Sequence, residues 1–219
     1  MLHEIATPNE LEDLICEVGF LPFFRNAIPG FSIEECTRPD LWFAPDEFGP
    51  WEWKGPLAKG GRCAYGKLFD KKAGFVSNEW LPHLANYRRN GYDFDALYDD
   101  GLASHTDKLI YDVLAAHGSL LSTDLRALCS GPKGFDTSIT RLQMQTYITI
   151  ADFEYMLDKR GNRYGWGVAR YAIAEAHHGA HLLQSAYDQP PTQSRQRVDA
   201  YLHQLLPHAS DAQISKIVG

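Results

Sequence analysis

Hydrophobic residues show their clearest periodicity in the middle of the chain. From Leu109 to Leu114 the apolar positions recur at helical spacing, and Gly118 suits a helix end. Asp136 or Thr137 is expected to cap a later helix. The helices predicted here cover 106–117, 123–129 and 136–145. Their tight spacing is typical of a helix-turn-helix.

After the third of these helices the period changes from 3.6 to 2. Residues 147–156 alternate in strand fashion, 163–171 can return beside them, and 158–162 form the turn. Helices followed by a two-stranded hairpin with a basic end are the order of a winged helix. We therefore expect a winged helix-turn-helix over residues 104–172.

The first hundred residues predict a mixed α+β unit. Thr7 and Glu10 form a capping-box pattern around Pro8, which predicts a helix over 8–18. Between Gly19 and Gly61 the chain is rich in Pro, Gly and aromatic residues, and 32–36 is its one helical candidate. A wrapping segment rather than regular structure is expected there.

A β-hairpin is expected next, with strands over 62–69 and 73–77 around a turn at 70–72. Asn78 is a candidate cap for a following helix that carries Trp80. The polar stretch 91–101, which has room for a short helix, marks a boundary.

The C-terminal part reads as helical. Its expected elements are an Ala/His-rich helix over 173–187, a helix over 192–206 and a short tail from 211. The fold class is therefore α+β, with a mixed unit over 1–103, the winged helix over 104–172 and a helical extension over 173–219.

Charge is distributed unevenly along this chain of net charge −7. Residues 54–89 hold 8 bases and 2 acids and are interleaved with aromatic residues. Such a mixture suits a polyanion surface, although lysines that flank a hairpin on a solvated face would give the same pattern. The bases are Lys54, Lys59, Arg62, Lys67, Lys71, Lys72, Arg88 and Arg89.

A winged helix that binds DNA places its third helix in the major groove and its basic hairpin end on the backbone or minor groove. The polar residues expected on that helix are Thr137, Ser138, Arg141, Gln143 and Gln145. Those expected at the hairpin end are Lys159, Arg160 and Arg163. Residues 132–171 hold only six bases against four acids, so a protein-interaction module or a homodimer stays open as the alternative.

His177 and His181 stand four residues apart, a spacing that can bind zinc on one helical face. Glu175 precedes them instead of following the first histidine, and His178 supplies no obvious third ligand position. Surface or core histidines are the simpler interpretation, so we expect no metal. No Gly-rich phosphate loop points to a cofactor.

The composition is that of a folded soluble protein, with 44% apolar and 22% charged residues. No apolar run approaches the length that spans a bilayer, and the acidic start lacks a secretion signal. The four cysteines are scattered without a C-x-x-C pair. We expect a cytoplasmic protein with reduced cysteines and no membrane partner.

Several runs of the sequence resemble the AlkZ-related proteins, winged-helix relatives of the AlkZ/YcaQ alkylpurine DNA glycosylases. The resemblance covers most of the chain. The runs that carry it are GPWEWKG (49–55), YGKLF (65–69), NYRRNGYDFD (86–95), GFDTSITRLQMQTY (134–147) and YGWGVARY (164–171).

The resemblance implies DNA as the partner and DNA repair as the setting. The glycosylases use a Gln-x-Gln or Gln-x-Asp motif that positions a water, and Gln143-Met144-Gln145 matches it. Trp51, Trp53 and Trp166 would offer stacking faces to an extruded base. The alternatives are glutamines that hydrogen-bond on a helix surface or buttress a hairpin, and a non-enzymatic transcriptional regulator or interaction module.

Overall fold

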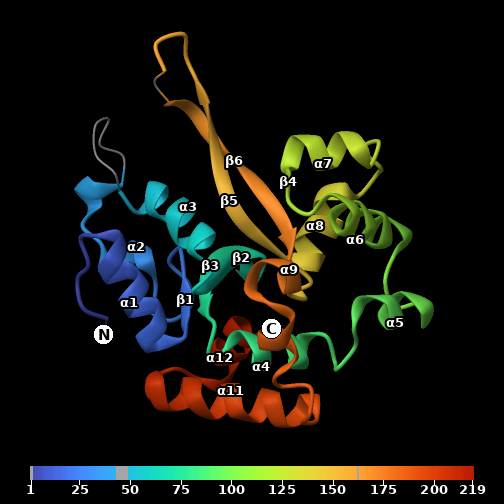
Figure 1. Cartoon of the computed structure of the whole chain (residues 1–219). Helices are drawn as coiled ribbons and strands as arrows, with labels where there is room; N and C mark the ends of the chain where they lie inside the picture. The colour runs from blue at the N-terminus through green and yellow to red at the C-terminus, as the bar shows by residue number, and fades with distance from the viewer. Residues whose placement is uncertain (1, 43–48, 162) are drawn as a thin grey trace.

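A computed structural model describes residues 2–42, 49–161 and 163–219, without the side chains of Arg163, Tyr164 and Trp166. The described chain is a mixed α+β fold with two three-stranded antiparallel sheets, ordered β1-β3-β2 and β4-β6-β5 (Figure 1). The strands are β1 (Phe20–Pro22), β2 (Cys63–Phe69), β3 (Lys72–Ser77), β4 (Leu120–Leu121), β5 (Ile148–Leu157) and β6 (Arg163–Ile173).

Helices surround both sheets. They are α1 (Pro8–Val18), α2 (Ile33–Cys36), the 3-10 helix η1 (Pro39–Leu41), α3 (Pro50–Gly60), α4 (Leu81–Arg88), α5 (Phe94–Asp99), α6 (His105–His117), α7 (Ser122–Leu128), α8 (Phe135–Met144), α9 (Ala174–His178), α10 (Ala180–Gln184), α11 (Pro191–Leu205) and α12 (Asp211–Val218). None of the helices described is long and apolar enough to cross a membrane.

Local signals placed many of these elements correctly. The Thr7 hydroxyl accepts from the Glu10 backbone at 3.2 Å, and the Glu10 carboxylate accepts from the Thr7 backbone at 3.0 Å, so the predicted capping box is confirmed. The predicted hairpin is confirmed as β2 and β3. Phe69 pairs with Lys72, and Asp70 and Lys71 between them both have positive φ, as a two-residue hairpin turn with matching twist requires.

The described part of the segment expected to wrap without regular structure contains three elements that sequence patterns missed, β1, η1 and α3. Strand β1 has only three residues, and all are buried. Helix α3 holds Pro56 in its interior and two glycines, which oppose helix formation in isolation. Burial of Trp53 and Leu57 stabilises it instead, and a Cβ added at Gly55 would lie 3.7 Å from the Phe153 Cβ of β5, which is an ordinary van der Waals contact.

Three helix boundaries differ from the predicted ones. Helix α4 begins after Trp80, and Asn78 is no cap because its amide donates to the Gly61 carbonyl at 2.7 Å. Helix α8 follows Gly134, whose φ of 84° turns the chain so that Phe135 enters the core. The expected helix over 173–187 is broken at Gly179, which has a φ of 97°.

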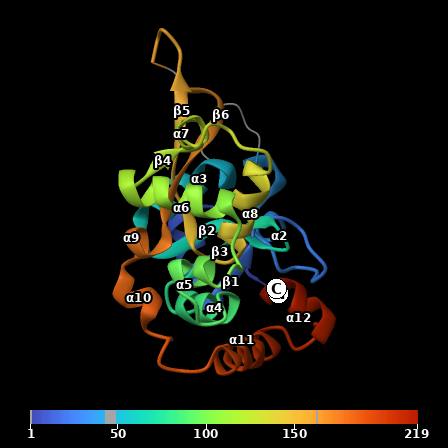
Figure 2. The ribbon, with the colours of Figure 1, turned by 90° about the vertical axis from the view of Figure 1, so that its right-hand side faces the viewer.

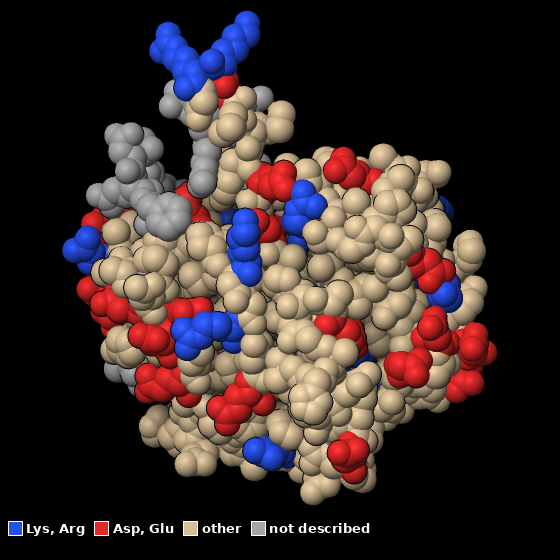
Figure 3. Space-filling view, viewed as in Figure 1, with Lys and Arg blue, Asp and Glu red and all other residues tan. Residues whose placement is uncertain are grey.

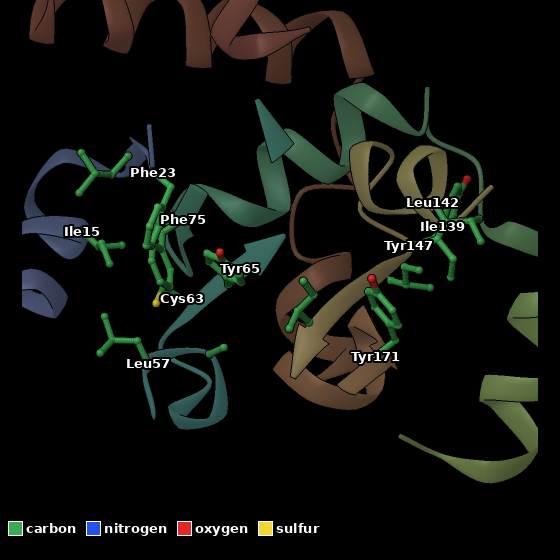
Figure 4. Packing of buried hydrophobic residues seen from close by; sticks show 14 of the residues in the cluster. Ile15, Phe23, Leu57, Cys63, Tyr65, Phe75, Ile139, Leu142, Tyr147 and Tyr171 are labelled. Atoms are coloured by element: carbon green, nitrogen blue, oxygen red, sulfur yellow. The ribbon is translucent and has the colours of Figure 1, made fainter. Parts of the chain in front are cut away.

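The first sheet is buried on both faces, which is why its strands lack a polar alternation. Leu21, Tyr65 and Phe75 face a core shared with α1, α3, α6 and α8. Figure 4 shows Tyr65 and Phe75 in this core. Their strand neighbours, such as Phe20 and Val76, face a second core. Helices α4, α11 and α12 supply that second core below the sheet (Figure 2). Alternate side chains of each strand thus join different cores.

The shared core crosses the boundary expected near residue 103. Tyr65 of β2 lies in one buried cluster with Leu142 of α8 and Tyr171 of β6 (Figure 4). The second sheet also gains β4, which the sequence showed only as a connection, through the pairs Leu120–Tyr171 and Leu121–Arg170. Beyond this core, β5 and β6 continue as a long hairpin that leaves the body (Figure 1).

Close packing of the first sheet leaves no room for a side chain at Gly74. A Cβ there would lie 2.8 Å from the Leu21 carbonyl oxygen and nearer still to the Phe69 ring. Gly74→Ala should lower the free energy of unfolding by about 1–3 kcal/mol, the usual cost of overpacking. Urea denaturation measures this change.

The matched control is Gly60→Ala at the end of α3, where the nearest heavy atom is 3.9 Å from the new Cβ. This variant should be as stable as the wild type or slightly more stable, because alanine favours a helix. Equal effects of the two substitutions would contradict the packing argument.

Candidate nucleic-acid interface

The free edge of β2 is where the two sheets meet. Strand β2 is outermost in its sheet, so its outward backbone groups need partners from elsewhere. The Lys67 N–H donates to Gln143 Oε1 at 3.0 Å, and the Thr149 hydroxyl donates to the Tyr65 carbonyl at 3.1 Å. Side chains from α8 and β5 therefore complete the edge of the first sheet.

Gln143 is fully buried by this arrangement. Its amide nitrogen donates to the Ile139 carbonyl at 3.2 Å, and its oxygen would lie 3.1 Å from a Cβ on Gly66. Gln145 is only half-buried and lies two positions further along the chain, at the C-cap of α8. Two residues along a helix point to different sides, so the two amides do not converge on one water.

Arg88 and Arg89, both predicted as phosphate contacts, instead cap the end of α8. Arg88 donates to the Met144 carbonyl at 2.9 Å, and Arg89 donates to the carbonyls of Gln145 and Thr146. The last carbonyls of a helix lack partners within it and attract cations. The two guanidinium groups are therefore used inside the protein, which corrects their expected place at the interface.

Further contacts fix both arginines. Arg88 also donates to the carbonyls of Leu68 and Val218 at 2.7 and 2.8 Å, and its burial lowers its pKa to about 10. Arg89 is 2% exposed, lies 4.5 Å from the Tyr147 ring centre and pairs with Glu175. Burial closes Arg89 to a DNA phosphate, and the donors of Arg88 are used on backbone carbonyls within the protein.

The first three bases of the 54–89 segment also have partners within the protein. Lys54 is 2% exposed and lies over the Trp51 ring, 3.6 Å from its centre. Lys59 and Arg62 are exposed, but Lys59 pairs with Asp152 at 3.0 Å and Arg62 with Glu12 at 2.7 Å.

Lys67, Lys71 and Lys72 are the bases of this segment that reach the surface without an ion pair to a described residue. They surround the β2–β3 turn. The Lys67 ammonium donates to the Thr140 hydroxyl at 3.3 Å, which brings the turn beside α8. A groove of about 600 Å³ lies there, lined by Lys71, Asp136, Thr137, Thr140, Arg141 and Met144. We name this the α8 groove.

Thr137 and Arg141 both line the α8 groove, as expected for the outer face of the third helix. Thr137 is exposed. Arg141 is 41% exposed and pairs with the buried Asp107 at 2.7 Å. Burial opposes ionisation of Asp107, but hydrogen bonds from Arg141 and Ser104 lower its pKa below the ordinary value. Some of the N–H donors of the Arg141 guanidinium are thus already used on Asp107.

Thr140 was missing from the residues predicted for this surface. It stands three positions after Thr137, which is the spacing of neighbours on one helical face, so the periodicity alone could have identified it.

The end of the β5–β6 hairpin is a basic surface that stands apart from the rest of the described chain. Lys159 and Arg160 are exposed in the hairpin tip, which we define as residues 158–161. Figure 3 shows basic side chains at the end of this projection, clear of the body. No ion pair joins either one to a described residue. The side chain of Arg163 lies outside the described part, so its predicted contact stays a prediction.

The tryptophans differ in access. Trp53 is 1% exposed, so no base can stack on it in this conformation. Trp51 is half-buried beneath Lys54. The side chain of Trp166 is outside the described part.

The histidines expected to share a helical face lie on two helices. Gly179 separates His177 in α9 from His181 in α10. His177 Nε2 lies 2.8 Å from the Ala58 carbonyl oxygen, and His178 lies against Thr149. Burial lowers the pKa of His178 to about 4. Within the described residues, no three His, Cys, Asp or Glu side chains gather as metal ligands.

The position of Gln143 predicts a cost in stability when its amide is removed. Gln143→Ala leaves the Lys67 N–H without its acceptor, so the free energy of unfolding should fall by about 1–3 kcal/mol. Gln145→Ala is the matched control, since this side chain is half-buried. Urea denaturation of both variants tests the assignment, and equal stability of Gln143→Ala and wild type would refute it.

The buried Lys54 predicts an unusual pH dependence. Desolvation lowers its pKa to about 8, whereas an unfolded lysine titrates near 10.4. Between these values the unfolded state holds the extra proton, so stability should rise with pH in that window. The difference in unfolding free energy between wild type and Lys54→Met, measured from pH 7 to 10, should shift in favour of the wild type above pH 8. A flat difference would contradict this.

Comparison with known proteins identifies the family. A family model described as "AlkZ related" matches residues 5–219. No curated protein and no solved structure matches the chain. The match covers nearly the whole sequence, including α8, the β2–β3 turn and both strands of the projecting hairpin. The chain therefore belongs to the AlkZ-related family.

Proposed function

We propose that residues 104–172 form a winged helix and that the protein binds duplex DNA through it. Helices α6, α7 and α8 follow one another, and β4 lies between the first two and pairs with the hairpin strand β6. In a winged helix the third helix enters the major groove, while the hairpin, or wing, touches the backbone or minor groove. Here these roles fall to α8 and to the β5–β6 hairpin.

The projecting hairpin tip is the observation that carries the proposal. Lys159 and Arg160 are exposed at the end of two long strands, and nothing in the described part of the chain pairs with their charges. Lysine and arginine gain free energy near phosphates mainly by releasing condensed counterions. A pair of bases held away from an acidic body suits a backbone contact.

The α8 groove supports a second contact of the same kind. Thr137 and Thr140 offer hydroxyls that hydrogen-bond to phosphates or base edges, and Lys67 and Lys71 border them. Arg141 has donors left after its pair with Asp107. Asp136 lies in the same groove and weakens its positive field, although its carboxylate pairs with Arg126, so we expect moderate affinity.

Family membership supports DNA as the partner, because the AlkZ proteins to which the family is related are DNA glycosylases. We do not extend the proposal to base excision by Gln143 and Gln145. The oxygen and the nitrogen of the Gln143 amide are both hydrogen-bonded to the protein backbone, and Gln145 lies on another side of the chain. We infer that Gln143 is structural and that the Gln-x-Gln spacing has no catalytic part in this geometry.

Removing the tip charges tests the proposal. Lys159→Ala with Arg160→Ala should weaken binding to a plain duplex and flatten the plot of log affinity against log salt, by up to about two counterions. Fluorescence anisotropy at salt concentrations from about 50 to about 200 mM measures both quantities, because affinity for DNA changes steeply over this range.

The control is Lys59→Ala with Arg62→Ala, which removes the same charge from bases already paired with Asp152 and Glu12. This pair should leave the salt slope unchanged. If the wild type does not bind a duplex at low salt, the proposal fails and a protein-interaction role takes its place. If both double variants bind equally, the tip has no part in binding.

A further inference from the structure

The β2–β3 turn borders a second basic pocket besides the α8 groove. Lys71 lines the α8 groove, whereas its neighbours Asp70 and Lys72 line the second pocket, which has a volume of about 300 Å³. Arg25, from the loop after β1, and Lys216 of α12 line it as well. Among the described residues of this lining, three bases thus accompany one acid. We name this the α12 pocket.

The positive charge of the α12 pocket is accessible to a ligand. All three bases are exposed, and no ion pair joins Lys72 or Lys216 to a residue in the described part of the chain. Arg25 lies 3.9 Å from Glu34, but its side chain is 70% exposed, so solvent screens this pair and leaves the guanidinium open. The pocket therefore attracts an anion.

One arginine holds the elements of both basic sites together. Arg88 donates to the carbonyls of Met144 at the end of α8 and of Val218 in α12, at 2.9 and 2.8 Å. The same guanidinium donates to the Leu68 carbonyl of β2 at 2.7 Å, and the Lys71 N–H donates to the Met144 sulfur at 3.4 Å. Figure 2 shows α8 and α12 on the same side of the ribbon. A DNA strand that leaves the α8 groove past the turn therefore meets the α12 pocket.

Phe24 gives the α12 pocket an aromatic wall. Its side chain lines the pocket and is 37% exposed, and its ring packs edge-on against Phe23 with 5.1 Å between the ring centres. Asn26 braces the loop that carries it, because its amide donates to the Phe31 carbonyl at 2.7 Å and accepts from the Ile28 N–H at 2.9 Å. An aromatic ring beside several bases is the combination that binds single-stranded nucleic acid, since unpaired bases stack and the backbone carries the charge.

Resting on the proposed duplex binding, we propose that the α12 pocket receives a single strand of DNA that continues beyond the duplex held at α8. A pocket of about 300 Å³ admits one strand and excludes a double helix. Paired bases are stacked on one another and offer no face to Phe24, whereas an unpaired base does. Lys72 and Lys216 are placed to hold the phosphates of that strand. The preferred substrate is therefore a duplex with a single-stranded overhang.

The test compares a blunt duplex of roughly 15 base pairs, about one and a half helical turns, with two kinds of extended duplex. One kind carries about six unpaired nucleotides at its 3′ or its 5′ end, and the other is lengthened by about six base pairs. Fluorescence anisotropy should show that the wild type binds one of the two overhang duplexes at least about fivefold more tightly than the blunt duplex, the lower end of what one stacked base supplies. Its salt slope should be steeper by about two, because three bases meet single-strand phosphates.

Two variants divide the gain into charge and stacking. Arg25→Gln with Lys216→Gln should bind the blunt duplex as the wild type does but should lose most of the extra salt dependence on the overhang. Phe24→Leu keeps an apolar side chain and removes the ring, so it should lose about fivefold of the gain in affinity and keep the salt slope. Thermal melting should show that both variants are folded.

The matched control is Lys59→Gln with Arg62→Gln, which removes two exposed bases that do not line the pocket. It should keep the full gain. Equal wild-type affinity for blunt and overhang duplexes, or an equal gain from the paired extension, would overturn the single-strand site and leave the proposed function standing. No binding of any of these DNAs by the wild type would remove both.

Discussion

The unpaired edge of β2 is the constraint on which the arrangement of the molecule depends. A strand at the edge of a sheet exposes backbone donors and acceptors that must be covered when that edge is buried. Gln143 and Thr149 cover them from α8 and β5. Because both contacts involve fixed backbone atoms of β2, they set the position of α8 and the start of the hairpin together.

The end of α8 is fixed by a related requirement. Three successive carbonyls, of Met144, Gln145 and Thr146, accept from Arg88 at the end of α4 and from Arg89, its C-cap residue. Thr146 has a φ of 65° that turns the chain into β5. Both positively charged guanidinium groups therefore stabilise contacts inside the protein. This explains in part why a segment of formal charge +6 leaves only Lys67, Lys71 and Lys72 at the surface without an ion pair to a described residue.

Local chemistry was enough to predict several elements, and tertiary contacts decided the rest. The capping box at Thr7, the turn at Asp70 and Lys71 and the strand alternation after Gln145 each act within a few residues. Helix α3 depends on burial of Trp53 against a distant core, so its Pro and Gly residues misled the local pattern.

The same division applies to the candidate site. Thr137, Arg141 and Lys159 could be predicted because an exposed helix face and a hairpin turn are local features. The burial of Gln143 and Arg89 could not, because their partners Lys67 and Thr146 lie 76 and 57 positions away in the sequence. A three-residue motif says nothing about partners at that separation.

A protein of net charge −7 can bind a polyanion only where its own acids are screened or distant. The hairpin provides the distance. Glu154 is the last strand acid before the tip, and the three residues from it to Leu157 extend the strand by about 10 Å. The Debye length at physiological salt is about 8 Å, so Lys159 and Arg160 lie beyond the unscreened field of Glu154, and Asp158 is the acid that shares the tip with them. The length of the hairpin thus reconciles an acidic body with a phosphate contact, because a shorter projection would bring DNA into the field of those acids.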